Sequence, residues 1–262
     1  MTHSRLKERW DAGEVAYGGW LMEGYDRAVE AYELAGFDYV GFDCQHSLLD
    51  EAAAGALIRR FSSPEHAMIA RANSQAPAGI GKLLDAGADA VIVPMVNNPE
   101  EAARIVEAFR YPPRGGRSFG PILSGMGAGP AEIEARALCI VMIETAEGLE
   151  KVDEIAAVDG VDGFYVGPAD LSIGLGLPYA GAFTTDQLVP AFERIRAACD
   201  KHGVVLGAHA SSADSAHRWV DLGCQFVSLN SNIALLTSAA RQLHADLRGR
   251  AAAAGTDNGP YN

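Results

Sequence analysis

Short apolar runs alternate with longer amphipathic stretches from one end of the chain to the other. Residues 90–94 and 138–143 are almost continuously apolar, which is typical of parallel strands buried on both faces. The predicted strands cover residues 15–21, 39–43, 68–71, 90–94, 138–144, 163–166, 204–208 and 226–229.

The amphipathic stretches between these runs predict helices. The predicted helices cover residues 26–35, 49–62, 78–86, 99–109, 148–157, 185–201, 213–221 and 233–247. Glycines such as Gly87 and Gly203 follow helix ends, where a left-handed residue is favoured. Strict alternation of eight strands and eight helices predicts a (β/α)₈ TIM barrel. The alternative is a doubly wound open sheet, but residues 20–25 are not the glycine-rich dinucleotide loop typical of that fold.

Two segments interrupt the alternation. Residues 111–130 are rich in Gly, Pro and Arg, and a loop of this length inside a domain is usually functional or part of an interface. Residues 250–262 contain Ala, Gly and polar residues and are expected to form a flexible tail. We therefore expect one barrel domain over residues 1–249, followed by this tail.

Composition narrows the class of protein. The chain has 262 residues, 48% of them hydrophobic, and 34 acidic against 21 basic residues give a net charge of −13. Nucleic acid is therefore not an expected partner, because phosphate binding needs a basic face. The chain has no apolar run of about 18 residues to cross a membrane and no signal-peptide pattern at its start, so we expect a soluble cytoplasmic protein.

The four cysteines are far apart and lack zinc-cluster spacing, so buried free thiols are expected rather than disulfides. They are Cys44, Cys139, Cys199 and Cys224.

The ends of the predicted strands indicate where chemistry is expected, because TIM-barrel active sites lie at the carboxyl ends of the strands. This rule selects His46, Arg71, Glu144, Asp170 and His209.

Glu144 and Asp170 follow neighbouring strands in the predicted barrel. Two carboxylates alone on a dry rim would repel each other, and one would be driven to stay protonated. A bound Mg²⁺ or Mn²⁺ would remove this conflict, since such ions take oxygen ligands and often only one or two carboxylates. The alternative is structural, with arginine pairing or a helix-capping role for Asp170.

Arg71 and the two histidines complete the predicted rim. A guanidinium at the end of a strand can bind a carboxylate or an oxyanion, although Arg71 could instead be an ion-pair partner of Glu144 or Asp43. His46 is the best general-base candidate because its ordinary pKa lies near neutral pH, and its alternative role is structural. His209 lies on the same rim.

Lysines are absent from this rim. The chain contains only Lys7, Lys82, Lys151 and Lys201, and none of them ends a strand. A Schiff-base aldolase needs a buried lysine at the rim, so the sequence favours a metal as the electron sink.

From about residue 15 to 240 the chain resembles the HpcH/HpaI family of metal-dependent (class II) pyruvate aldolases. The stretches that carry this resemblance are residues 35–46, Arg71, and residues 83–96, 111–117, 143–145 and 160–172.

The resemblance implies an assembly and a set of site residues. It implies a (β/α)₈ barrel whose last helix is exchanged between subunits, in a homohexamer of three dimers. It implies that Glu144 and Asp170 hold Mg²⁺, Mn²⁺ or Co²⁺, which a 2-oxo acid chelates through its keto oxygen and carboxylate. It further implies that Arg71 stabilises the enolate oxygen and that His46 and Asp85 act as a dyad through a water. The implied substrate-binding residues are Arg71, Gly167, Pro168, Ala169, Asp170 and His209, with the backbone amides of Ala169 and Asp170 on the substrate carboxylate.

Asp85 raises a geometric question. It lies near the end of the helix that follows strand three, and such a helix runs away from the catalytic rim. A working dyad therefore predicts that Asp85 reaches the site of a neighbouring subunit. The chain also departs from the family at Gln45, where Glu is frequent, and at His209, where an apolar residue near the aldehyde is more frequent. Gln45 removes a negative charge beside the implied metal site, which bears on metal preference, and His209 leaves the aldehyde open.

The expected reaction is reversible retro-aldol cleavage of a 4-hydroxy-2-oxo acid to an aldehyde and pyruvate or hydroxypyruvate. One alternative is another metal-enolate lyase, such as an oxaloacetate decarboxylase or a CoA-ester lyase. A CoA enzyme needs a basic groove, and here only Arg114 and Arg117 could contribute to one. The other alternative is a non-catalytic 2-oxo-acid binding protein, which would not exchange pyruvate protons in heavy water.

Overall fold

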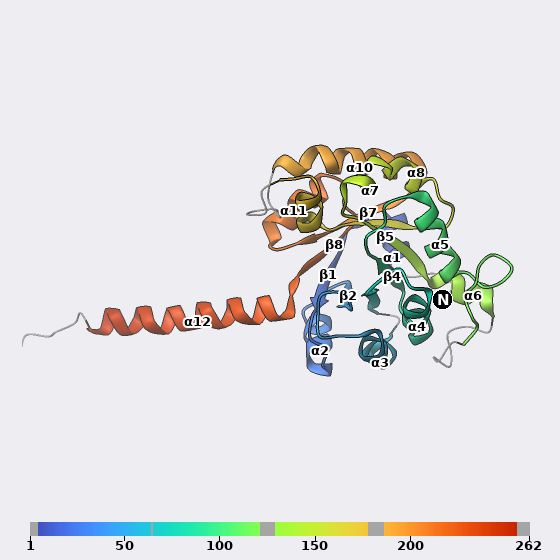
Figure 1. Cartoon of the computed structure of the whole chain (residues 1–262). Helices are drawn as coiled ribbons and strands as arrows, with labels where there is room; N and C mark the ends of the chain where they lie inside the picture. The colour runs from blue at the N-terminus through green and yellow to red at the C-terminus, as the bar shows by residue number, and fades with distance from the viewer. Residues whose placement is uncertain (1–4, 64, 121–128, 178–185, 256–262) are drawn as a thin grey trace, which may run out of the picture.

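The computed structural model describes residues 5–63, 65–120, 129–177 and 186–255. Within these residues, eight parallel strands pair in chain order, and β8 pairs with β1 to close a barrel (Figure 1). The strands are β1 (Ala16–Leu21), β2 (Tyr39–Asp43), β3 (Ala67–Arg71), β4 (Ala90–Val93), β5 (Leu138–Ile143), β6 (Gly163–Val166), β7 (Val205–Ala210) and β8 (Phe226–Ser231). The predicted TIM barrel is confirmed, and closure excludes the open sheet.

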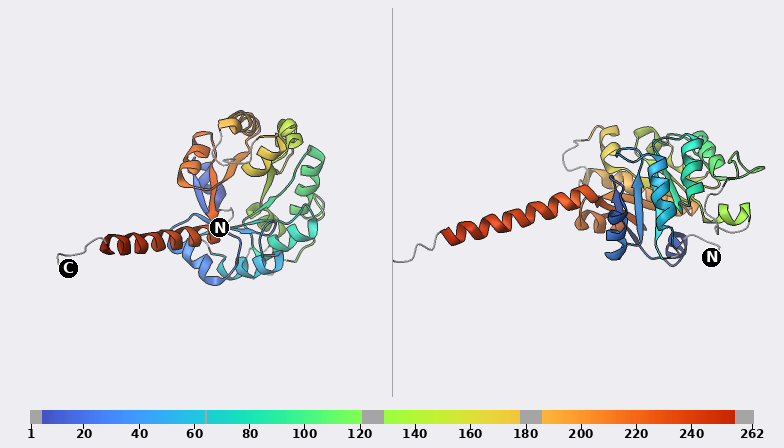
Figure 2. Two further views of the ribbon diagram at one scale, coloured as in Figure 1. Left: turned by 60° about the vertical axis from the view of Figure 1, so that its left-hand side comes forward. Right: turned by 90° about the horizontal axis from the view of Figure 1, so that it is seen from below.

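Helices surround the strands, as the left view of Figure 2 shows. Those close to their predicted positions are α2 (Asp26–Leu34), α3 (Glu51–Phe61), α4 (Pro77–Ala86), α5 (Pro99–Phe109), α10 (Val189–His202), α11 (Ala213–Asp221) and α12 (Asn232–Gly255). A 3₁₀ turn, η1 (Asp186–Leu188), precedes α10, and residue 185 lies outside the described residues. Gly87 and Gly203 adopt the expected left-handed conformation at helix ends.

Some helix predictions were wrong or incomplete. The single helix predicted over residues 148–157 is two helices, α7 (Ala146–Glu150) and α8 (Val152–Ala156), because the backbone leaves helical geometry at Lys151 (φ −99°, ψ 15°). Three short helices were not predicted, namely α1 (Arg5–Asp11), α6 (Pro130–Arg136) and α9 (Pro168–Gly174). Of the segment 111–130, residues 121–128 lie outside the described residues.

The core has two parts, inside and outside the barrel. Inside, Trp20, Tyr165 and Phe226 pack together, and Trp10 of α1 lies 5.1 Å from Phe226 between ring centroids. α1 thereby covers the amino-terminal end of the barrel. Outside, apolar side chains of the strands pack against the surrounding helices. The four cysteines are buried and free, as predicted.

Aspartates at the amino ends of alternate strands fix the register of the barrel. Asp38, Asp89 and Asp162 precede β2, β4 and β6, and each accepts a backbone N–H from the preceding strand at 2.8–2.9 Å. Burial raises the pKa of Asp89 to about 6 against the opposing effect of its bond to the Met68 N–H.

α12 leaves the barrel instead of packing on it, and both views of Figure 2 show it projecting into solvent. Its leucines Leu235, Leu236, Leu243 and Leu247 are 41–63% exposed. The helix continues to Gly255, beyond the predicted end at 247 and into the expected tail, because residues 251–254 are alanines with high helix propensity. Residues 256–262 lie outside the described residues. Among the described helices, none is long and apolar enough to cross a membrane.

Candidate active site

A cavity of about 240 Å³ opens at the carboxyl ends of the strands, and most of the predicted site residues line it. They are His46, Arg71, Gly167, Pro168, Ala169, Asp170 and His209. The site thus collects residues that lie more than 160 positions apart in the chain, as the rule of strand ends predicts.

Arg71 is held by Asp43, and the two are the last residues of β3 and β2 in paired register. Arg71 donates from Nε to Asp43 Oδ1 at 2.9 Å and from Nη2 to Oδ2 at 2.6 Å. Oδ1 also accepts the backbone N–H groups of Gln45 and His46. Burial alone would raise the pKa of Asp43, but Arg71 and these N–H groups outweigh burial and hold that pKa below its ordinary value. Asp43 therefore fixes both Arg71 and the start of the His46 loop.

The pairing leaves one side of the Arg71 guanidinium for a ligand. Asp43 uses Nε and Nη2, so Nη1 is not engaged by the carboxylate. The guanidinium carbon also lies 5.7 Å from the centroid of the Trp20 ring, and Arg71 is only 9% exposed. A guanidinium fixed along one edge can bind an anion or a carbonyl oxygen with the other. The structure therefore makes Arg71 a partner of Asp43, and it also places Arg71 in the lining of the cavity, where anion binding stays a prediction.

Asp43 lines the cavity, although sequence reasoning considered it only as an ion-pair partner of Arg71 and did not select it as a site residue. A signal was present, because both residues end apolar strands that are adjacent in a barrel.

Glu144 lies directly after β5 and is only 2% exposed. Its Oε1 accepts the backbone N–H of Met95 at 2.7 Å, and Met95 adopts a left-handed conformation (φ 59°). Burial raises the pKa of Glu144 to about 7, and the nearby charge of Asp170 adds to this rise, while the Met95 bond and Arg71 oppose it. Burial is thus the main cause of the raised pKa of Glu144, and the charge of Asp170 is a smaller contribution in the same direction.

Gly167 provides space for the second oxygen of Glu144. A Cβ atom at position 167 would lie 2.8 Å from Glu144 Oε2, closer than real contacts allow. Asp170 lies in the first turn of α9, which begins after Gly167 without a side-chain cap. Pro168 has no N–H, so Ala169 and Asp170 carry the first backbone donors of this helix.

The donor set fits a hard divalent cation with few protein ligands. Among the described residues, no group of three or more His, Cys, Asp or Glu side chains is arranged to hold a metal. Mg²⁺ and Mn²⁺ sites commonly use one or two carboxylates and complete their shell with water and substrate. Glu144 and Asp170 would supply such a pair, and a cation would offset both the burial and the charge of Asp170 that raise the pKa of Glu144.

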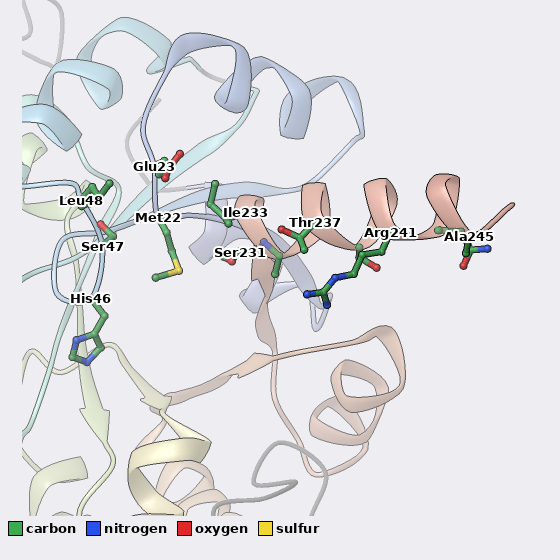
Figure 3. A pocket seen from close by; sticks show the side chains of 13 residues that line it. Met22, Glu23, His46, Ser47, Leu48, Ser231, Ile233, Thr237, Arg241 and Ala245 are labelled. Atoms are coloured by element: carbon green, nitrogen blue, oxygen red, sulfur yellow. Dashed lines mark hydrogen bonds between the residues drawn. The ribbon is translucent and has the colours of Figure 1, made fainter. Parts of the chain in front are cut away.

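His46 borders two cavities. Besides the cavity described above, it lines a larger one of about 900 Å³ between the loops after β1 and β2 and the first half of α12. Figure 3 shows His46, Met22 and Ser231 near the start of α12, with Thr237 and Arg241 further along the helix. The larger cavity exists because α12 departs from the barrel, and it gives the His46 side of the site an open approach.

His209 lies within β7, and its ring contacts the aromatic interior of the barrel. Its Nδ1 is 3.4 Å from the Tyr165 hydroxyl, and its ring lies edge-on to Trp20 with centroids 5.8 Å apart. Burial and the positive charge of Arg71 lower the pKa of His209 to about 4. His209 is therefore a neutral hydrogen-bonding group at neutral pH.

Asp85 does not join this cavity. It lies in the last turn of α4 and pairs with Arg117 at 2.8 Å between Oδ1 and Nη2. It lines a separate cavity of about 480 Å³, together with Lys82 and Arg117.

The fold and the rim define an (β/α)₈ barrel protein with acidic, guanidinium and imidazole groups around one cavity. The chain belongs to the HpcH/HpaI aldolase/citrate lyase family, whose model matches residues 17–239.

Named relatives cover nearly the whole chain. A hydroxypyruvate/pyruvate aldolase from Rhizorhabdus wittichii is 34% identical over 94% of this chain and 99% of its own length. A 5-keto-4-deoxy-D-glucarate aldolase from Klebsiella pneumoniae is 31% identical over 92% of this chain and 95% of its own. The crystal structure of an HpcH/HpaI aldolase/citrate lyase family protein from Burkholderia cenocepacia superposes with a TM-score of 0.81 at 30% identity, covering 93% of this chain and 98% of that one.

Proposed function

We propose that this chain is a metal-dependent (class II) aldolase that reversibly cleaves 4-hydroxy-2-oxo acids into an aldehyde and pyruvate or hydroxypyruvate. The observation that carries the proposal is the pair Glu144 and Asp170 beside the fixed Arg71. Relatives named as hydroxypyruvate/pyruvate aldolases support this substrate class.

Glu144 and Asp170 would hold Mg²⁺, Mn²⁺ or Co²⁺. When bound, the metal supplies Lewis-acid stabilisation of the enolate charge that develops as the C3–C4 bond breaks. Arg71, oriented by Asp43, would direct Nη1 at the same developing charge, where a preorganised donor is most effective. The N–H groups of Ala169 and Asp170 would bind the substrate carboxylate.

Proton transfer is assigned to His46 acting through a water. In cleavage, this water takes the proton of the 4-hydroxyl, the C3–C4 bond breaks, and the aldehyde leaves. Protonation of the enolate carbon then gives pyruvate. His209 lies on the rim where the aldehyde end of the substrate would sit, and as a neutral imidazole it would offer a hydrogen bond there.

The proposed assembly is a homohexamer of three dimers in which α12 packs on a neighbouring subunit. Its exposed leucines support this, because several large apolar side chains exposed on one helix are typical of an interface. A dyad of His46 and Asp85 would also require a neighbouring subunit, because Asp85 lines a separate cavity of its own barrel. Measurement of solution mass by light scattering tests the assembly, and a stable monomeric variant with full activity would refute the sharing.

The test of function follows the exchange of pyruvate methyl protons in heavy water with Mn²⁺. Glu144→Ala and Asp170→Ala are expected to abolish exchange, whereas Asp200→Ala, an exposed carboxylate paired with Arg196 on α10, should leave it unchanged. Full exchange and turnover by chelator-treated protein would overturn the metal mechanism. Metal and pyruvate binding without exchange would instead identify a binding protein. A panel of aldehydes offered with pyruvate and hydroxypyruvate then defines the substrates.

A further inference from the structure

The loop of residues 111–117 has no role in the reaction described above, although it is one of the most distinctive segments of the sequence. It follows α5 and ends at Arg117, whose side chain is only 2% exposed. An arginine so deeply buried needs a compensating charge, because an unpaired buried cation is strongly destabilising.

Asp85 provides that charge. Arg117 donates from Nη2 to Asp85 Oδ1 at 2.8 Å, and the guanidinium carbon lies 4.8 Å from the Tyr111 ring centroid. Its Nε and Nη1 are buried and have no hydrogen-bond partner within the described part of the chain. The position of Arg117 is therefore set by one carboxylate and one aromatic ring.

The rest of the loop fixes the backbone that carries Arg117. The N–H groups of Gly116 and Arg117 donate to the carbonyls of Glu107 and Arg110 at 2.9 and 3.0 Å. Gly115 allows this approach, since a Cβ atom there would lie 2.4 Å from the Glu107 carbonyl oxygen. On the other side of the loop, Glu134 accepts the Tyr111 N–H and pairs with Arg114. The loop is thus anchored to both α5 and α6.

Within the described residues, Asp85 is held on one side only. Its side chain remains 23% exposed, and it faces the cavity of about 480 Å³. Its Oδ2 is not used by Arg117, and a Cβ atom at Gly120 would lie 3.6 Å from it, an ordinary contact distance. A carboxylate anchored through Oδ1 can present Oδ2 to a group outside its own barrel.

We propose that Arg117 is the positioning residue of Asp85, and that the loop of residues 111–117 exists to hold this guanidinium in place. Arg117 fixes Oδ1 so that Oδ2 points outward, toward the catalytic cavity of a second copy of this chain. This inference rests on the proposed function, in which Asp85 works with His46 of a neighbouring subunit.

The test is a double-mutant cycle on the intact oligomer with Arg117→Met, Asp85→Asn and the combined variant. Arg117→Met is expected to lower kcat about ten- to a hundredfold, as misplacement of a catalytic group does. The KM for the 2-oxo acid and the Mn²⁺ dissociation constant should stay within about twofold of the unaltered protein. Because both residues act as one unit, the combined variant should be no slower than Asp85→Asn. Methylguanidinium should restore activity to Arg117→Met but not to the combined variant.

Arg104→Met is the matched control, because Arg104 is an exposed arginine on α5 and lies outside this loop. It should retain kcat within about twofold. If Arg117→Met does not fold, Arg117→Lys keeps a buried cation, and it should lose kcat while its melting temperature and oligomeric mass are preserved.

Three results would overturn the proposal. The first is an unchanged kcat in folded Arg117→Met or Arg117→Lys. The second is a loss of kcat in the combined variant that equals the product of the two single losses. The third is equal rescue by methylguanidinium in Arg117→Met and in the combined variant. Full activity of Asp85→Asn would overturn the shared dyad and this inference together. Absence of exchange and turnover in the unaltered protein would instead refute the proposed function itself, so the failures are distinguishable.

Discussion

The pair between Asp43 and Arg71 gives the sharpest prediction, because both side chains are buried and joined by two hydrogen bonds. The side chains of Arg71 and Asp43 are 11% and 2% exposed. In Asp43→Asn the amide oxygen can accept only one of the two hydrogen bonds that Arg71 donates. The amide NH₂ group then faces the other guanidinium N–H, donor against donor. Opposite charges about 4 Å apart attract by about 4 kcal/mol at an effective dielectric constant of 20. Removing one partner of a buried pair costs about 3–5 kcal/mol, so we expect Asp43→Asn to lower the free energy of unfolding by about 3 kcal/mol.

Urea denaturation at pH 7 measures this loss. Asp26→Asn is the matched control, because Asp26 pairs with Arg60 on the surface, where both side chains are about half exposed. This surface change should cost less than about 1 kcal/mol. Asp43→Asn should also reduce pyruvate proton exchange, since Arg71 loses its fixed orientation. Equal stability losses in the two variants, with normal exchange in Asp43→Asn, would contradict the role assigned to Asp43.

Other predictions concern the rim and the opposite end of the barrel. Gly167→Ala adds a Cβ atom that should displace the Glu144 carboxylate and weaken Mn²⁺ binding about tenfold, measured by EPR titration. Unchanged Mn²⁺ affinity would show that Glu144 does not need the space that Gly167 leaves. Because the folded-state pKa of Asp89 is raised to about 6, the stability that its protonated form contributes is complete below about pH 4 and is lost as the pH rises through 6. Asp89→Asn still accepts the Met68 N–H and does not ionise. Its stability relative to the unaltered protein should therefore rise between about pH 4 and 7, by at most about 3 kcal/mol. A stability difference that does not change with pH would exclude ionisation of Asp89 in this range. His209, with a pKa lowered to about 4, should give a flat NMR titration between about pH 5.5 and 8, and a midpoint near 6.5 would contradict its neutral state.

The strands and the rim were predictable from the sequence because they follow from periodicity and from one topological rule. Fully buried parallel strands are apolar at successive positions, so runs such as β5 were easily recognised. The direction of α4 was enough to predict that Asp85 lies away from the cavity at the carboxyl ends of the strands, because the helix after a strand returns to the opposite end of the barrel.

Tertiary context determined what the sequence did not predict. α1 is stabilised by burial of Leu6 and Trp10 under the barrel, and a helix of this length has too few apolar positions to show a period. The sequence left Glu144 and Asp43 as alternative partners of Arg71, and the choice depended on strand register, which sets Asp43 opposite Arg71 and which local pattern does not encode. The left-handed Met95 that donates to Glu144 had no glycine signal at its position.

The burial of Cys44, which follows Asp43 in the chain, affects how readily this thiol reacts with aldehydes. Because the thiolate is the nucleophilic form of cysteine, an aldehyde released in the proposed reaction would add most readily to an ionised thiol near the site. Cys44 directly follows the strand that ends at Asp43, yet it is only 6% exposed, and burial together with neighbouring carboxylates raises its pKa to about 12. Its sulfur therefore stays protonated and largely shielded from solvent, so this thiol should react only slowly with an aldehyde released in the proposed reaction.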